Sequence, residues 1–129
     1  MEVQISKGNW NKIQNYANAA YDLYRAEIGG MAVCVENKEG DWVIEQPIIL
    51  KQEVSGGNCV LDKGELARYY TKVGINKKYK NANYRFLWWH SHHTMGAFWS
   101  GTDLTAIEEF SEGDFSFALV VNLKEEYKM

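Results

Sequence analysis

The chain has 129 residues, 46% of them hydrophobic and 14% aromatic, which is typical of one globular domain that buries roughly two-thirds of its unfolded surface. Its net charge of −3 gives no broad electrostatic attraction to nucleic acid or to anionic lipid. No stretch approaches the roughly 20 apolar residues of a membrane span, and residues 1–6 lack the basic and apolar segments of a signal peptide. Cys34 and Cys59 form no Cys-x-x-Cys pair and have apolar neighbours, so we expect buried, reduced thiols in a cytoplasmic protein.

Residues 3–27 predict a short strand and one amphipathic helix. Val3 and Ile5 are typical of a strand, and Ser6 can cap the helix that follows. We expect the helix to end near Glu27, before Gly29-Gly30, so that its last turn carries Glu27 to a strand edge. Apolar residues recur at spacings of three and four along one face of this helix: Trp10, Ile13, Ala17, Ala20 and Tyr24.

The next segment predicts strands. We expect one over residues 30–36, a second over 42–45, and a further strand over 54–61 that is interrupted by Gly56-Gly57. Pro47 leaves two alternatives for the apolar residues after it. They continue the second strand beyond a kink, or they begin another strand.

A second helix is predicted after Asp62, which has the spacing of a capping box with Glu65. Its inner face and its end are formed by Leu66, Tyr69 or Tyr70, Val73 and Gly74. The residues that follow, 76–83, contain three lysines around Tyr79. They favour a solvated loop, with a contact to an acidic partner as the alternative.

The last part of the chain predicts a buried strand over 84–89, a helix over 101–111 and a strand over 115–121. Residues 124–129 begin another strand, which suggests a domain trimmed from a longer chain. Strands interleaved with helices predict an α/β or α+β fold, in which helices cover the faces of a β-sheet.

All three histidines lie directly after the strand over 84–89. Positions two apart on a strand point to the same face, so His90 and His92 project together while Ser91 and His93 point the other way. Ser100 follows after a seven-residue gap and can cap the helix over 101–111, with Asp103 in its first turn. Two imidazole nitrogens and one carboxylate oxygen make a three-ligand zinc set that leaves a fourth position for water.

Each part of this pattern also has an ordinary structural interpretation. Ser-x-x-Asp is typical of a capping box, and two histidines at this spacing on a strand are common without a metal. Glu27, taken alone, is an ordinary surface glutamate. The conjunction of these residues in one order and spacing favours a metal site.

His90-x-His92-x7-Ser100-x2-Asp103 resembles the signature of the JAMM metalloproteases, also called the JAB/MPN family. In that family a glutamate lies upstream, where a first helix gives way to the first long strand, and Glu27-Ile28-Gly29-Gly30 stands in that place here. The resemblance is to a prokaryotic or phage-type member and extends over nearly the whole chain. It implies one JAMM/MPN domain over residues 1–129, with a cytidine-deaminase-like fold built on a central mixed β-sheet.

The same resemblance implies a function. Zinc would be held by His90, His92 and Asp103, Glu27 would be the general base, and Ser100 would donate a hydrogen bond to the oxyanion. Members of the family cleave isopeptide or peptide bonds at the C-terminus of ubiquitin-like proteins, or trim sulfur-carrier proteins of similar fold. The implied partner is therefore such a protein, whose extended tail could be added along a sheet edge.

The chain departs from the family at His93, where a proline is usual, and at the bulky Phe98 and Trp99. Three other classes of function are alternatives. A non-catalytic MPN-type scaffold usually lacks one of the ligands, and a zinc nucleobase deaminase needs His-x-Glu and Pro-Cys-x-x-Cys, which are absent. A phage cell-wall peptidase or a RadC-like DNA-associated protein fits the same motif spacing.

Overall fold

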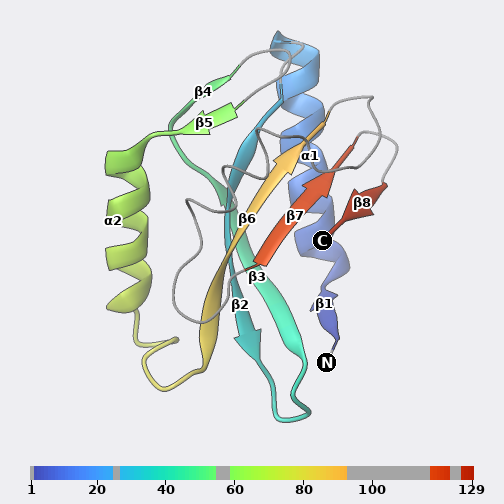
Figure 1. Cartoon of the computed structure of the whole chain (residues 1–129). Coiled ribbons are helices and arrows are strands. Elements are labelled where there is room, and N and C mark those ends of the chain that lie inside the picture. The colour runs from blue at the N-terminus through green and yellow to red at the C-terminus, as the bar shows by residue number, and fades with distance from the viewer. Residues whose placement is uncertain (1, 25–26, 55–58, 93–116, 123–125) are drawn as a thin grey trace.

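A computed structural model describes residues 2–24, 27–54, 59–92, 117–122 and 126–129 (Figure 1). Within this part of the chain no helix is long and apolar enough to cross a membrane. In chain order the elements are β1 (Val3–Ile5), α1 (Lys7–Tyr24), β2 (Gly29–Glu36), β3 (Trp42–Ile49), β4 (Gln52–Val54), β5 (Cys59–Leu61), α2 (Lys63–Gly74), β6 (Tyr84–Ser91), β7 (Phe117–Val121) and β8 (Tyr127–Lys128).

Six strands form one curled, mixed sheet in the order β1-β3-β2-β6-β7-β8 (Figure 1). The β1–β3 and β6–β7 pairs are parallel, and the other pairs are antiparallel. A separate antiparallel hairpin is formed by β4 and β5. The mixed α+β architecture predicted from the sequence is confirmed at this level.

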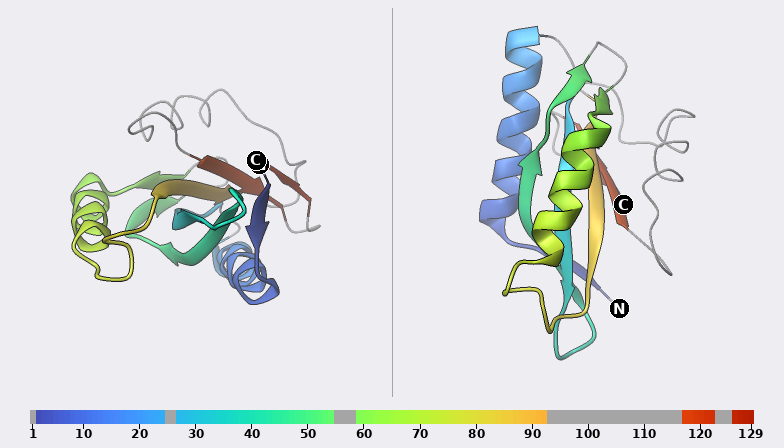
Figure 2. Two further views of the ribbon diagram at one scale, coloured as in Figure 1. Left: turned by 90° about the horizontal axis from the view of Figure 1, so that it is seen from below. Right: turned by 90° about the vertical axis from the view of Figure 1, so that its left-hand side faces the viewer.

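The two helices cover opposite faces of this sheet, and residues of β2 alternate between them (Figure 2). Ala32 and Cys34 pack in the cluster that contains Ile13 of α1. Met31 and Val33 pack in the cluster that contains α2, whose buried residues are Leu66, Tyr69 and Val73. The apolar stripe predicted for α1 is buried at Ile13, Ala17 and Ala20.

Both helices begin at side-chain caps. The Ser6 hydroxyl accepts a hydrogen bond from the Asn9 amide at 3.1 Å, and the Asp62 carboxylate accepts one from the Glu65 amide at 2.9 Å. The reciprocal half of a capping box is not formed at α2. The Asp62 amide donates to the Lys51 carbonyl instead, and the Glu65 carboxylate binds Arg68 at 2.6 Å.

The structure corrects three of these predictions and decides between the two alternatives at Pro47. α1 is described over Lys7–Tyr24, and Glu27 lies outside a helix, in the segment that enters β2. β3 continues through Pro47, with Gln46 at a φ of 51° and a register shift opposite it in β2. The strand predicted over 54–61 is two short strands that pair with each other. The loop over 76–83 is only partly solvated, because Tyr79 is buried against the α2 cluster.

Cys34 is a free thiol at the centre of the sheet and is fully buried. Because burial disfavours the charged thiolate, the pKa of Cys34 is raised to about 12. The reduced, buried state predicted for this cysteine is therefore confirmed. The helix predicted over 101–111 lies outside the described residues.

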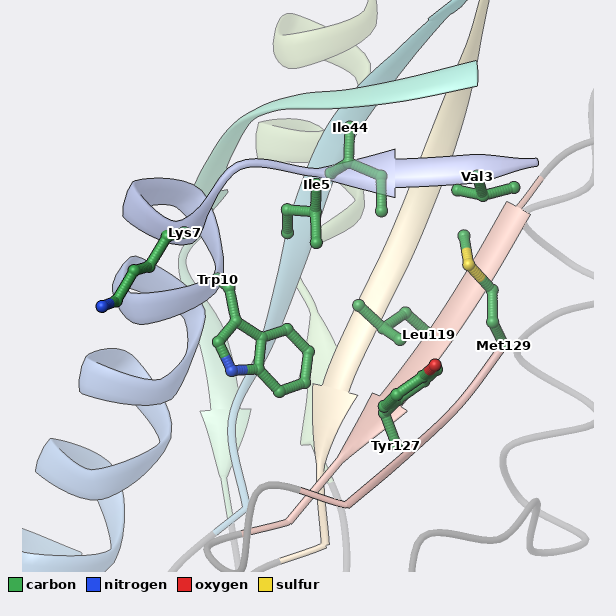
Figure 3. A pocket seen from close by; sticks show the side chains of 8 residues that line it. All are labelled: Val3, Ile5, Lys7, Trp10, Ile44, Leu119, Tyr127 and Met129. Atoms are coloured by element: carbon green, nitrogen blue, oxygen red, sulfur yellow. The ribbon is translucent and has the colours of Figure 1, made fainter. Parts of the chain in front are cut away.

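An apolar pocket of about 390 Å³ lies between the two edges of the curled sheet and the start of α1 (Figure 3). Its lining comes from β1, α1, β3, β7 and the C-terminal residues: Val3, Ile5, Lys7, Trp10, Ile44, Leu119, Tyr127 and Met129. The Lys7 ammonium group points away from Tyr127 and Met129 (Figure 3). The lining of the pocket is therefore mainly apolar.

Candidate metal centre

Three residues of the predicted site, Glu27, His90 and His92, come together where the end of β6 lies beside the start of β2 (Figure 1). His90 is paired with Gly29 across this antiparallel ladder. Glu27 lies two residues before Gly29, so the ladder brings it next to the histidines although they are distant in the sequence. The pairing of β2 with β6 is what assembles the site.

The two histidine rings lie on the same face, as the alternation of a strand predicted. Their ring centroids are 4.7 Å apart, with an interplanar angle of 81°. The Trp88 ring stacks on the other side of His90, at a centroid distance of 4.8 Å and an angle of 9°. Both histidines are almost completely buried. Packing and the strand backbone thus restrict the imidazole orientations.

Glu27 completes a buried cluster with these two rings. Its side chain is 4% exposed, and its Oε2 atom lies 3.7 Å from Nδ1 of His90. One ligand atom from each of Glu27, His90 and His92 lies within 4.8 Å of the other two. A buried carboxylate is costly unless a proton, a cation or a metal compensates its charge. The cluster therefore has the chemistry of a cation site.

The side chains of the cluster belong to the types that bind zinc. Zinc in proteins takes imidazole nitrogens and carboxylate oxygens, and tetrahedral ligands at about 2.1 Å lie about 3.4 Å from one another. The atoms of this cluster lie within 4.8 Å of one another, so His90 and His92 would have to approach that separation as ligands, whereas a neighbouring base can stay at the wider distance. On the predicted assignment, His90 and His92 are ligands and Glu27 is the neighbouring base.

Two further residues hold the backbone next to Glu27. Ser91 exchanges hydrogen bonds with Ile28: its hydroxyl accepts from the Ile28 amide at 3.0 Å, and its amide donates to the Ile28 carbonyl at 2.8 Å. Gln52 does the same for Gly29, accepting from its amide at 2.9 Å and donating to its carbonyl at 2.6 Å. Reasoning from the sequence assigned neither residue a role. Nothing in the local pattern around Gln52 indicates a contact 23 positions away.

Gly30 is required by close packing at the same place. A Cβ atom on Gly30 would lie 1.9 Å from the Ile48 carbonyl oxygen and 2.9 Å from the Trp89 ring. Only glycine fits between these groups without a shift of the backbone. This steric limit explains the second glycine of Glu27-Ile28-Gly29-Gly30.

The other predicted site residues, Ser100 and Asp103, lie outside the described residues, as do His93, Phe98 and Trp99. The structure therefore brings together three of the five predicted residues, Glu27, His90 and His92. The apolar pocket lies on the other face of the sheet. Leu119, which lines it, is paired with Trp89 and packs on the α1 side.

No family model matches the sequence, and no curated protein matches it either. The resemblance to the JAMM metalloproteases thus depends on the residues themselves and on their arrangement.

Proposed function

We propose that this protein is a zinc-dependent hydrolase of the JAMM type, with a cytidine-deaminase-like JAB/MPN fold. Its reaction would be cleavage of an isopeptide or peptide bond at the C-terminus of a ubiquitin-like or sulfur-carrier-like protein. One observation carries the proposal. The motif predicted that Glu27 would lie beside His90 and His92, and the three side chains form one buried cluster.

On this proposal His90, His92 and Asp103 hold the ion. Bound zinc supplies Lewis-acid chemistry, since it lowers the pKa of a water molecule to about 7 and polarises a carbonyl group. The residues of the chain do the rest. The Glu27 carboxylate accepts a proton from the attacking water and returns it to the departing amine. The Ser100 hydroxyl donates a hydrogen bond to the oxyanion.

The burial of Glu27 supports the base role. The Glu27 side chain is 4% exposed and lies beside an imidazole, so its carboxylate is shielded from bulk water and its position is restricted. Proton transfer by a positioned group requires such fixed geometry. Among the described strands β4 and β5 pair only with each other, and Gln52 of β4 binds Gly29, so an extended tail could be added along an edge of this pair near the cluster.

The test compares zinc content with hydrolysis in wild-type protein and in Glu27→Gln. We expect Glu27→Gln to keep one zinc per chain by elemental analysis and to lose at least about 10²-fold in turnover of a ubiquitin-like fusion. His92→Ala should lose both metal and activity. Glu39→Gln, in the exposed β2–β3 turn, is the matched control and should resemble wild type in both measurements.

The outcomes separate the classes of function. Suppose that the wild-type protein binds zinc, but neither it nor Glu27→Gln hydrolyses any of a panel of ubiquitin-like and sulfur-carrier tails. That result would favour a non-catalytic scaffold. If the protein cleaves cell-wall peptides and no protein tails, the proposed substrate is wrong and the phage cell-wall peptidase is favoured. Wild-type protein that binds no zinc would reject the proposal as a whole.

A further inference from the structure

We propose that Ser91 and Gln52 are positioning residues, which fix the Glu27 carboxylate against the two imidazoles by holding the two residues that follow it. This role deepens the proposed function and rests on it for the effect on turnover. The effect on the backbone can be measured without any activity.

The hydrogen bonds follow the alternation of an extended chain, in which successive residues direct their N–H and C=O groups to opposite edges. Ile28 is directed toward β6, where Ser91 takes both of its backbone groups. Gly29 is directed to the other edge, where the Gln52 carboxamide takes both of its groups. We call this pair of contacts, one on each side of the segment, the Ser91–Gln52 clamp.

The clamp acts where the β2–β3 ladder stops. The register of β2 with β3 begins at Gly30, which pairs with Ile49, so Gly29 lies beyond the last paired residue. Gln52 replaces the missing strand partner with a side chain. Its Nε2 atom also donates to the Leu50 carbonyl at 2.9 Å, which ties the carboxamide to the chain that leaves β3.

The position of Ser91 links the two halves of the cluster. It lies between His90 and His92 on β6, and its side chain is 1% exposed. The segment that contains the two histidines is therefore also hydrogen-bonded to the segment that contains Glu27. A shift of about 1 Å in a catalytic group can cost about 10²-fold in rate, so a clamp two residues from the base can control turnover.

The first measurement is amide hydrogen exchange by NMR on the metal-free 129-residue chain. Loss of one hydrogen bond changes a local equilibrium by about tenfold. Gln52→Met should therefore speed exchange of the Gly29 amide by about tenfold, and Ser91→Ala should do the same for Ile28. The Val33 amide, in the middle of β2, should stay within about twofold of wild type.

The second measurement is steady-state turnover with zinc bound. Gln52→Met and Ser91→Ala should lower kcat by about 10²-fold, with zinc content and KM close to wild type. Ser91→Thr, which keeps the hydroxyl oxygen, should recover most of the kcat and the protection of Ile28. Gln4→Met, at an exposed position of β1, is the matched control and should leave both measurements unchanged.

Two results would overturn the inference. One is Gly29 exchange in Gln52→Met that equals exchange in Gln4→Met. The other is accelerated exchange with an unchanged kcat in both clamp variants. If wild-type protein hydrolyses no substrate, the proposed function fails, and the exchange rates alone decide whether the clamp holds the backbone.

Discussion

At the scale of single residues, the candidate site depends on Gly30, which has no side chain. Gly30 lets the backbone of β2 pass close to the Ile48 carbonyl and to the Trp89 ring. Trp89 precedes the first histidine and belongs to the core on the α1 side. The close approach at Gly30 therefore sets how tightly the strand that enters from Glu27 packs against its neighbours.

We expect Gly30→Ala to destabilise the fold by about 1–3 kcal/mol, because the added methyl group would overlap a backbone oxygen that cannot move alone. Gly8→Ala is the opposite case, since its Cβ would meet only the Ser6 hydroxyl at 4.0 Å within helix α1. That change should stabilise by about 0.5–1 kcal/mol. Urea unfolding measures both. Equal stabilities of the two variants would contradict the steric argument.

At the scale of elements, the start of α2 depends on Asp62, the residue that caps it. The pKa of Asp62 is lowered, chiefly because its carboxylate accepts the Glu65 amide hydrogen bond. A carboxylate whose pKa is lower in the folded state contributes stability above its unfolded pKa of about 3.9. That contribution is lost as the pH falls through the folded-state pKa.

Asp62→Ala should therefore lower the thermal unfolding midpoint at pH 7, and the difference from wild type should shrink below about pH 4. Asp62→Asn keeps an acceptor oxygen without the charge and should recover part of the midpoint at pH 7. Calorimetry between pH 3 and pH 7 measures these differences. A deficit in Asp62→Ala that is the same at every pH would show that the charge of the cap has no effect.

The elements also show what the sequence could predict. Periodicity identified the buried stripe of α1, the inner face of α2 and the shared face of His90 and His92, because these depend on neighbours within a few residues. The prediction that the last turn of α1 carries Glu27 was wrong, because Glu27 lies in the non-helical segment that enters β2. Glu27 nevertheless lies beside His90 and His92, because this approach depends on the pairing of β2 with β6 and not on the helix.

The contacts that could not be predicted join distant segments. The Gln52 side chain hydrogen-bonds to the Gly29 backbone, where a neighbouring strand would otherwise pair. Tyr79 is buried against α2 and β6, although lysines surround it in the sequence. Pairing between strands is decided by the whole sheet, so local patterns left the path after Pro47 open. Ser100 and Asp103 remain predictions from the motif.

At the scale of the whole molecule, β2 connects the parts. It pairs with β3 and β6, contributes to both apolar clusters and leads from Glu27 into the core. Events at the cluster are therefore coupled to the most buried strand of the sheet. Binding of an ion to the folded state alone would stabilise the whole fold by mass action.

The buried Cys34 makes that coupling measurable, because it acts as a reporter within β2. The reactive form of a thiol is the thiolate. Cys34 reacts slowly in the folded protein because it is buried and because its pKa is raised to about 12, which leaves little thiolate. In a Cys59→Ser background, a thiol reagent at pH 8 should modify Cys34 at least about 10³-fold more slowly in native protein than in denaturant. Added zinc should slow this modification further, and His92→Ala should remove the zinc effect. The modification rate of Cys34 would then report how often β2, the strand that follows Glu27, opens.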